Sequence, residues 1–396
     1  MLTEIKKDIF WVGCTDWNIR YFHGPMYTTH RGTTYNAYLI AGAEPALIDT
    51  VYTPFSGRLL DNIREVLDPA SLKYVVVNHV EIDHSGALPA VMEAAPQATI
   101  ICSAKAAPAI DKHFNGSWEK IIVKTGDTVS LGRHTLTFVE APMLHWPDSM
   151  FTYIPEEKLL LPNDAFGQHY ASSFRFDDEA DMAEVMQEAK KYYANILLPF
   201  SPLVLKKIDE VVKMGIAIDM IAPSHGIIWR SNPDKIIAAY LDWARGTNRK
   251  KAVVVYDTMW GSTDQMASAI IDGLIESGME VRAFHMSVSD RNDVIAEVID
   301  AELVVIGSPT VNREFIPSLS AFLDDLTGLK PRGKRAALFG SSGWSRGATD
   351  KMAVRVKEAG FTLLEERMEV DWVPGAEELE QCRAFGRKLG EGYTGE

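Results

Sequence analysis

Cysteine, long apolar runs and clusters of basic residues are all scarce in this chain. Its three cysteines, Cys14, Cys102 and Cys382, are widely separated and form no CxxC pair, which argues against a disulfide framework and a thiolate metal site. No apolar stretch approaches the roughly 18 residues that span a bilayer, and the N-terminal segment lacks a signal-peptide pattern. We therefore expect a cytoplasmic protein, without a membrane partner, in which any metal is held by histidines and carboxylates.

The charge balance argues against nucleic-acid binding. The formal net charge is -14, and no basic block longer than NRKK, at residues 248–251, occurs. Phosphate backbones are bound by clustered lysines and arginines, which this chain does not offer. The fingerprints GxGxxG and GK[ST] of dinucleotide and P-loop folds are also missing from the turns where they would be expected.

The length of 396 residues, with 46% hydrophobic residues, suits two domains of an α/β class. Residues 9–165 are rich in predicted strands and are followed by helices, which indicates a layered α/β domain over residues 1–248. After the polar segment at residues 246–251, five strands alternate with five helices. That alternation predicts a doubly wound parallel sheet over residues 252–396.

Three loops of the C-terminal half are expected at the carboxyl ends of parallel strands, where such sheets bind ligands. The first, TMWGST, places the hydroxyls of Thr258, Ser262 and Thr263 at a helix N-terminus, which is typical of an anion site. Because the loop has no lysine, a monophosphate is favoured. Trp260 and Trp344 could stack on a flat ring, although an ordinary helix cap and half-buried aromatic residues are the alternative explanation.

Residues 252–396 resemble a flavodoxin domain, in a family that binds FMN through a hydroxyl-rich loop and two ring-flanking loops. The resemblance implies that the first loop holds the phosphate of FMN and that the other two flank its isoalloxazine ring. The implied phosphate contacts are Thr258, Trp260, Gly261, Ser262 and Thr263, and the implied ring contacts are Pro309, Thr310, Val311, Asn312, Ser342, Gly343, Trp344 and Gly347.

The stretch VVVNHVEIDHSG, at residues 75–86, ends an apolar run in a group of ionisable side chains. Alternation along the chain turns His79, Glu81 and Asp83 the same way, and His84 heads the next helix. A polar loop that caps this helix would be a simpler explanation for the motif alone. Three further residues follow strand-like runs, however, at positions that suit convergence on one site: His145, Asp164 and His225.

Together these seven residues resemble the metallo-β-lactamase superfamily, an αββα sandwich with a two-metal site. Glu81 departs from the hydrolytic members, which carry a second histidine at this position. A carboxylate makes the site harder and more anionic, which favours iron over zinc.

A carboxylate-rich diiron site in one chain with an FMN domain is the combination found in flavodiiron proteins, and the chain resembles that family over its full length. The segments that carry this resemblance include WNIRYFHGP, THRGTTYNAYLI, APMLHWPDSMFTY, LLLPNDAFGQH and APSHGIIWR. The resemblance implies one iron bound by His79, Glu81 and His145, another bound by Asp83 and His225, and Asp164 as the bridge. Whether His84 ligates stays open, because relatives differ in this.

The implied activity is reduction of O2 to water, of NO to N2O, or both, with FMN relaying electrons. His23 and Tyr193 are expected to line the substrate pocket, and Trp146 is expected to contact the flavin of a partner in a head-to-tail homodimer, with a tetramer also open. No rubredoxin module occurs in the chain, so an external rubredoxin-like donor or a reduced deazaflavin is expected. The rival hypotheses are a zinc hydrolase fused to a flavodoxin domain and a non-catalytic FMN electron carrier.

Overall fold

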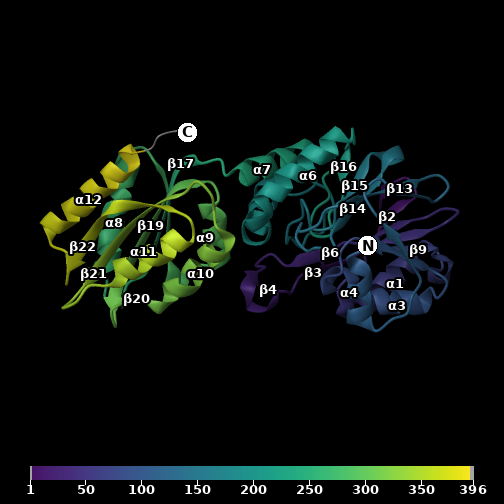
Figure 1. Cartoon of the computed structure of the whole chain (residues 1–396), viewed down its shortest axis with the longest axis horizontal. Coiled ribbons are helices and arrows are strands. Elements are labelled where there is room, and N and C mark those ends of the chain that lie inside the picture. The colour runs from purple at the N-terminus through teal and green to yellow at the C-terminus, as the bar shows by residue number, and fades with distance from the viewer. Residues whose placement is uncertain (1, 393–396) are drawn as a thin grey trace. The chain divides into compact units, whose positions relative to one another are not determined.

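The computed structural model describes residues 2–392, which divide into two compact units (Figure 1). The first unit contains the chain as far as Tyr192 together with Pro202–Leu241, and the second contains Tyr193–Ser201 together with the chain from Asp242 onward. Each unit has its own sheets and its own hydrophobic core. Within the described residues, no helix is long and apolar enough to cross a membrane.

Two sheets form the centre of the first unit. The seven-stranded sheet has the order β1-β2-β7-β8-β9-β10-β11, and the five-stranded sheet has the order β12-β13-β14-β15-β16. The strands of the first sheet are β1 (Thr3–Lys6), β2 (Ile9–Trp11), β7 (Tyr38–Ile40), β8 (Ala46–Ile48), β9 (Tyr74–Val77), β10 (Thr99–Ser103) and β11 (Lys120–Val123). Those of the second are β12 (Thr128–Ser130), β13 (Thr135–Glu140), β14 (Met150–Ile154), β15 (Leu159–Leu161) and β16 (Met220–Ile221).

The core of the first unit lies between these two sheets. Because side chains alternate along a strand, one face of each strand is available to a shared core. Ile40, Ile48 and Val76 of the larger sheet join Phe138 and Met150 of the smaller one in a single buried cluster. The two sheets pack against each other and so bury the apolar strand faces that the sequence pattern predicted.

Helices lie outside the two sheets and complete an αββα sandwich, as the sequence predicted (Figure 1). Helices on the side of the larger sheet are α1 (Ser56–Arg64), α3 (Leu88–Ala94) and α4 (Ala106–Phe114), and those on the side of the smaller sheet include α6 (Ser201–Lys213) and α7 (Pro233–Arg245). Two short hairpins were not anticipated from the sequence: β3 (Cys14–Asp16) with β6 (Thr33–Tyr35), and β4 (Tyr21–Phe22) with β5 (Tyr27–Thr28).

The second unit is a parallel five-stranded sheet with the order β18-β17-β19-β21-β22, to which β20 adds a short antiparallel partner. This is the order of a flavodoxin-like doubly wound sheet and confirms the predicted fold. The strands are β17 (Arg249–Tyr256), β18 (Glu280–His285), β19 (Ala301–Val311), β20 (Glu314–Phe315), β21 (Arg335–Ser342) and β22 (Thr362–Asp371). The helices are α8 (Ser262–Glu276), α9 (Arg291–Val298), α10 (Ser320–Leu329), α11 (Ala348–Glu358) and α12 (Ala376–Glu391).

Helices α8 and α12 approach each other closely because glycines stand at their crossing. A Cβ atom on Gly273 would lie 2.0 Å from the carbonyl oxygen of Arg383, and one on Gly386 would lie 2.2 Å from that of Ile270. Neither distance is compatible with a side chain. The two glycines therefore fix α8, whose N-terminus faces the carboxyl ends of the strands, against the rest of the unit.

Candidate functional sites

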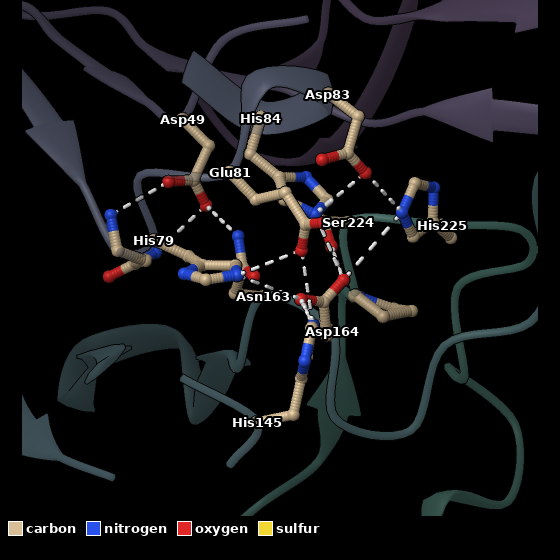
Figure 2. A network of polar contacts seen from close by, with 12 residues as sticks. Asp49, His79, Glu81, Asp83, His84, His145, Asn163, Asp164, Ser224 and His225 are labelled. Atoms are coloured by element: carbon tan, nitrogen blue, oxygen red, sulfur yellow. Dashed lines mark hydrogen bonds and ion pairs between the residues drawn. The ribbon is translucent and has the colours of Figure 1, made fainter. Parts of the chain in front are cut away.

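The side chains expected to ligate metals converge at strand ends in the first unit (Figure 2). β9 is a run of β-branched residues that ends at Val77, and the loop behind it carries His79 and Glu81. The short helix α2 (Ile82–Ser85) then presents two further side chains, Asp83 and His84. The remaining three come from later loops: His145 between β13 and β14, Asp164 after β15, and His225 after β16.

Four of these residues form a first ligand group, in which one atom of each lies within 4.8 Å of the others: His79, Glu81, His145 and Asp164. Glu81 Oε2 lies 3.2 Å from His79 Nε2 and 3.2 Å from His145 Nε2. Asp164 Oδ2 lies 3.3 Å from His145 Nε2. The arrangement directs two imidazole nitrogens and two carboxylates at one point.

A second ligand group consists of Asp83, His84 and His225. Asp83 Oδ2 lies 3.0 Å from both His84 Nε2 and His225 Nε2. The other carboxylate oxygen of Asp164, Oδ1, lies 2.9 Å from His84 Nε2 and 3.6 Å from His225 Nε2. Asp164 therefore presents one oxygen to each group, and the side chain of His84 points into the second group.

The donor atoms of this cluster fit a pair of bound cations. Asp83 Oδ1, Asp164 Oδ2 and both ring nitrogens of His84 are buried without a hydrogen bond. Buried polar atoms are normally satisfied, and a buried charge without compensation is strongly unfavourable. Two metal ions would satisfy the carboxylate oxygens and Nε2 of His84, and would neutralise the three converging carboxylates. A set of oxygen and imidazole nitrogen donors without thiolates is suited to iron.

The pKa values of the imidazoles report the excess negative charge. Burial alone would lower the pKa of His79, but hydrogen bonds to Asp148 and Glu81 raise it well above its usual value. Burial would also lower the pKa values of His84 and His145. Neighbouring carboxylates outweigh this effect and raise both pKa values to about 9. Such a site attracts cations, and metal ions compete there with protons.

Two ligands are oriented by hydrogen bonds at their outer nitrogens. His79 Nδ1 lies 3.0 Å from Asp148 Oδ2, and that carboxylate oxygen also accepts from the backbone N–H of Val80 at 2.8 Å. His225 Nδ1 lies 2.6 Å from the carbonyl oxygen of Thr34. Each contact leaves Nε2 facing the ligand group, which is the usual support for a metal-bound histidine. Sequence reasoning missed Asp148, although it lies three residues after His145.

A buried carboxylate joins the two loops on which the first group depends. Asp49, at the end of β8, accepts from the backbone N–H of Asn78 at 2.8 Å and from its side chain at 3.0 Å. It also accepts from Asn163 Nδ2 at 3.1 Å. Because Asn78 precedes His79 and Asn163 precedes Asp164, Asp49 fixes the spacing of these two ligands. Burial raises the pKa of Asp49.

His23 lies beside the first group, as the sequence suggested. It occupies the tip of the β4–β5 hairpin, and its Nε2 is 2.9 Å from Glu81 Oε1. Trp146 is half-buried, with its ring edge-on to His79 at a centroid distance of 5.1 Å. Both residues therefore contact the ligand set in the described structure. A flavin contact for Trp146 stays a prediction.

Tyr193 is placed differently from its neighbour Tyr192. The hydroxyl of Tyr193 is 2.9 Å from Ser201 Oγ, and its ring packs on Trp243 at 5.4 Å, all within the second unit. Tyr192, the last residue of α5 (Met182–Tyr192), instead lies with its ring 6.2 Å from that of His225. Of these two tyrosines, Tyr192 is therefore the one beside the ligand groups, and sequence reasoning did not select it.

The second unit has a cavity of about 660 Å³ at the carboxyl ends of its strands. Most of the residues expected to bind FMN line it: Thr258, Trp260, Ser262, Pro309, Thr310, Asn312, Ser342, Gly343 and Trp344. Four lie beside the lining residues without contributing to it: Gly261, Thr263, Val311 and Gly347. Lining residues that were missed are Met259, Arg313, Ser341, Ser345, Trp372 and Val373.

One end of this cavity is suited to a phosphate. Gly261, with φ of 89°, stands at the N-cap of α8, and its N–H donates to Thr258 Oγ1 at 3.0 Å. The buried hydroxyl of Thr263 lies 2.9 Å from Ser341 Oγ, which ties the start of α8 to the end of β21. Ser262, the first residue of α8, is part of the wall. Backbone N–H groups and hydroxyls at a helix N-terminus bind anions.

Aromatic rings at the cavity are left uncovered by the chain itself. Trp260 is 88% exposed and Trp344 is 89% exposed, although both line the cavity. Trp372, from the loop after β22, lies 6.2 Å from the ring of Trp344. Large exposed rings around a cavity indicate a flat ligand that stacks on them. A flavin mononucleotide fits both the rings and the anion site.

The two units together define a class of protein: a flavoprotein that combines a flavodoxin-like unit with a two-metal unit of metallo-β-lactamase type. A flavodoxin family model matches residues 254–386, and a model described as ODP family beta lactamase matches residues 33–226. The nitric oxide reductase of Moorella thermoacetica is 55% identical over 387 residues, which cover 97% of each chain.

Solved structures agree over nearly the whole chain. The rubredoxin oxygen:oxidoreductase of Desulfovibrio gigas is similar with a TM-score of 0.95 and 37% identity, covering 98% of each chain. The flavodiiron protein of Giardia intestinalis has a TM-score of 0.95 and 36% identity, covering 99% of this chain and 96% of that one. The chain belongs to the flavodiiron protein family and is an oxidoreductase of that type.

Proposed function

We propose that this enzyme reduces NO to N2O, and O2 to water, at a non-haem diiron site in its first unit. The observation that carries the proposal is the position of Asp164, which presents one oxygen to each of two ligand groups. The names of the relatives from Moorella thermoacetica and Desulfovibrio gigas support the two gases as substrates. Glu81 supports iron, since hydrolytic relatives of this fold carry a histidine there.

We assign each proposed iron to one of the two ligand groups. His79, Glu81 and His145 would hold one iron, and Asp83, His84 and His225 would hold the other, with Asp164 shared between them. When bound, two adjacent ferrous ions supply electrons to a gas molecule without releasing a one-electron product.

The chain around the metals positions them and controls access. His23 is partly exposed and lies at hydrogen-bond distance from Glu81 Oε1, so it orients this carboxylate from the solvent side. Tyr192 and Phe22 place aromatic rings 6.2 Å and 5.6 Å from the ring of His225 and exclude water from the second group. The site is therefore polar at the metals and apolar beside them, as a site for small uncharged gases requires.

FMN in the second unit would supply the electrons. Thr258 and Ser262 would bind its phosphate, and Trp344 would stack on its ring, because these residues line the anion end and the aromatic end of one cavity. A flavin accepts electrons singly or in pairs, while the protein sets its position and polarity.

We further propose an external one-electron donor of the rubredoxin type, with reduced deazaflavin as the alternative. The name of the relative from Desulfovibrio gigas, a rubredoxin oxygen:oxidoreductase, supports the first. A head-to-tail homodimer, with a tetramer as a further possibility, would bring the FMN of one protomer to the metals of its partner near Trp146. Mixed dimers of Glu81→Ala and Trp344→Ala chains, assayed without added FMN, test this arrangement, since they should be more active than Glu81→Ala, which lacks activity, and than Trp344→Ala, which binds FMN weakly.

Metal analysis with visible spectroscopy tests the central proposal. The protein as purified anaerobically should contain two iron atoms and one FMN per chain, and should consume NO and O2 when supplied with reduced rubredoxin. Glu81→Ala should lose gas consumption but keep FMN, whereas Glu65→Ala, at an exposed position at the end of α1, should keep both. Two zinc ions with no response to either gas would instead indicate the hydrolase, and a metal-free first unit would indicate the electron carrier.

A further inference from the structure

The flavin cavity contains a single ionisable side chain. Its lining residues are apolar, hydroxyl-bearing or amide-bearing, except Arg313. A lone arginine is notable in a chain with a formal net charge of -14. Arg313 is itself exposed at the wall of the cavity, and a positive charge there acts on any charge that develops on a bound ligand.

The backbone holds Arg313 in place through a tight turn. β19 and β20 pair as Thr310 with Phe315 and Val311 with Glu314, which leaves Asn312 and Arg313 as a two-residue loop. Their φ angles are 54° and 64°, so both have the left-handed conformation of a type I′ hairpin turn. Glycine is the common residue at the second position of such turns. An arginine there adopts a less favourable backbone conformation, which a role for its side chain would explain.

This turn lies against the loop that flanks the flavin ring. A Cβ atom on Gly347 would lie 2.7 Å from the carbonyl oxygen of Arg313, and the backbone N–H of Ala348 donates to Thr310 Oγ1 at 3.3 Å. Trp344 lies in the loop after β21, which ends at Gly347, the N-cap of α11, and Ala348 is the first residue of that helix. The anion end, in contrast, is formed by the loop after β17. Arg313 is thus placed at the ring end of the cavity.

Nearby carboxylates are engaged with other cations. Glu314 pairs with Lys351 at 3.2 Å, and Glu369 and Asp371 pair with Arg346 at 3.3 and 3.1 Å. Within residues 2–392 no carboxylate forms an ion pair with Arg313. Its charge is consequently available to the ligand of the cavity.

We infer that Arg313 makes the cavity selective for the reduced form of FMN. The inference rests on the proposed binding of FMN in this cavity. Oxidised FMN has an uncharged ring, and its reduction by two electrons and one proton gives a ring with one negative charge at neutral pH. Arg313 attracts that charge and has little effect on the oxidised ring. It therefore raises the midpoint potential of the flavin, which eases its reduction by the external donor.

Equilibrium redox titration of the holoenzyme tests this inference, with dithionite as reductant and the flavin absorbance as signal. In Arg313→Gln the affinity for reduced FMN relative to oxidised FMN should fall about tenfold, which for a two-electron couple corresponds to a midpoint lower by about 30 mV. Arg313→Lys should keep most of the wild-type potential. Arg282→Gln, an equal change of charge at an exposed position on β18, should leave the potential unchanged.

Binding of oxidised flavins separates the possible outcomes. The Kd of oxidised FMN and that of riboflavin should each stay within about twofold in Arg313→Gln. An unchanged midpoint potential would overturn the inference. A large loss of affinity for FMN with unchanged affinity for riboflavin would also overturn it, because Arg313 would then bind the phosphate of FMN. If the wild-type protein binds no FMN at all, both the proposed function and this inference fail.

Discussion

His84 Nε2 lies 2.9 Å from Asp164 Oδ1, so the imidazole of His84 is directed into the metal centre. The same nitrogen is 3.0 Å from Asp83 Oδ2. Neither contact has the geometry of a hydrogen bond, since both ring nitrogens of His84 are buried without one. Donor atoms that approach one another in this way could hold a shared cation, which is the proposed second metal ion.

We predict that His84→Ala removes one of the two iron atoms. The second ligand group would keep only Asp83, His225 and the shared Asp164, which is too few donors for a stable site. Iron per chain should fall from two to about one, measured by inductively coupled plasma mass spectrometry. His113→Ala, at an exposed position in α4, serves as control. Full occupancy in His84→Ala would show that this imidazole only packs against the site.

Asp148 offers a second prediction, because it supports a ligand without being one. Its carboxylate accepts from His79 Nδ1 and from the backbone N–H of Val80. Loss of such an outer partner typically weakens metal affinity by about 10- to 100-fold. Asp148→Ala should therefore release iron to a chelator at concentrations that leave the wild type loaded. Asp148→Asn keeps a hydrogen-bond acceptor, so its iron release should lie between that of the wild type and that of Asp148→Ala. Equal iron release from all three proteins would contradict a role of Asp148 in supporting His79.

The convergence of the expected ligands was predictable because their positions follow a local rule. Each expected ligand stands just after an apolar run, and chain alternation decides which side chains share a face. The orientation of His84 and the role of Asp148 could not be predicted in this way, since both depend on contacts between segments far apart in the sequence. Trp372 follows β22 and so obeys the same strand-end rule, although it lies outside the three loops that were predicted to bind the ligand.

Tyr192 and Tyr193 show where helical pattern reasoning stops. Successive residues of a helix point about 100° apart, so only one of the two can face the ligand groups. The α-helix ends at Tyr192 and continues as a π-helical turn over Tyr193–Leu197. That wider turn changes the phase of the side chains, and the sequence carried no signal for it. The structure places Tyr192 near His225 and the hydroxyl of Tyr193 at Ser201.

A third prediction concerns the exposed aromatic ring of Trp344. Stacking on a planar ring contributes about 1–3 kcal/mol, judged from alanine substitutions in base-stacking sites. Trp344→Ala should therefore raise the Kd of FMN by about 10- to 100-fold, measured by quenching of flavin fluorescence. The first unit does not depend on this ring, so the iron content should stay at the wild-type value. Trp17→Ala, which removes another exposed tryptophan in the first unit, should leave FMN affinity unaltered.

The last prediction concerns the dependence of folding stability on pH, and it uses a carboxylate remote from the metal ligands. Asp177 Oδ1 accepts from the backbone N–H groups of Arg230 and Ser231, both at 3.0 Å, and Oδ2 accepts from Ser231 Oγ at 2.8 Å. Burial would raise the pKa of Asp177, but these hydrogen bonds outweigh it and lower the value. The ionised form is therefore favoured by folding.

A lowered pKa means that the stabilisation is complete above the pKa of the unfolded chain, about 3.9, and disappears as pH falls through the lower folded value. Asp177→Asn should thus be less stable than the wild type by roughly 1–3 kcal/mol, with a difference that is constant between about pH 5 and pH 8. Below about pH 4 the unfolded chain takes up a proton at Asp177, so the difference in stability between the two proteins should narrow and should disappear below the folded pKa of Asp177. Urea unfolding across this range measures the difference, and Asp178→Asn, at the exposed neighbouring position, is the control. A gap between Asp177→Asn and wild type that stayed the same down to pH 3 would show that the carboxylate acts through its shape and not through its charge.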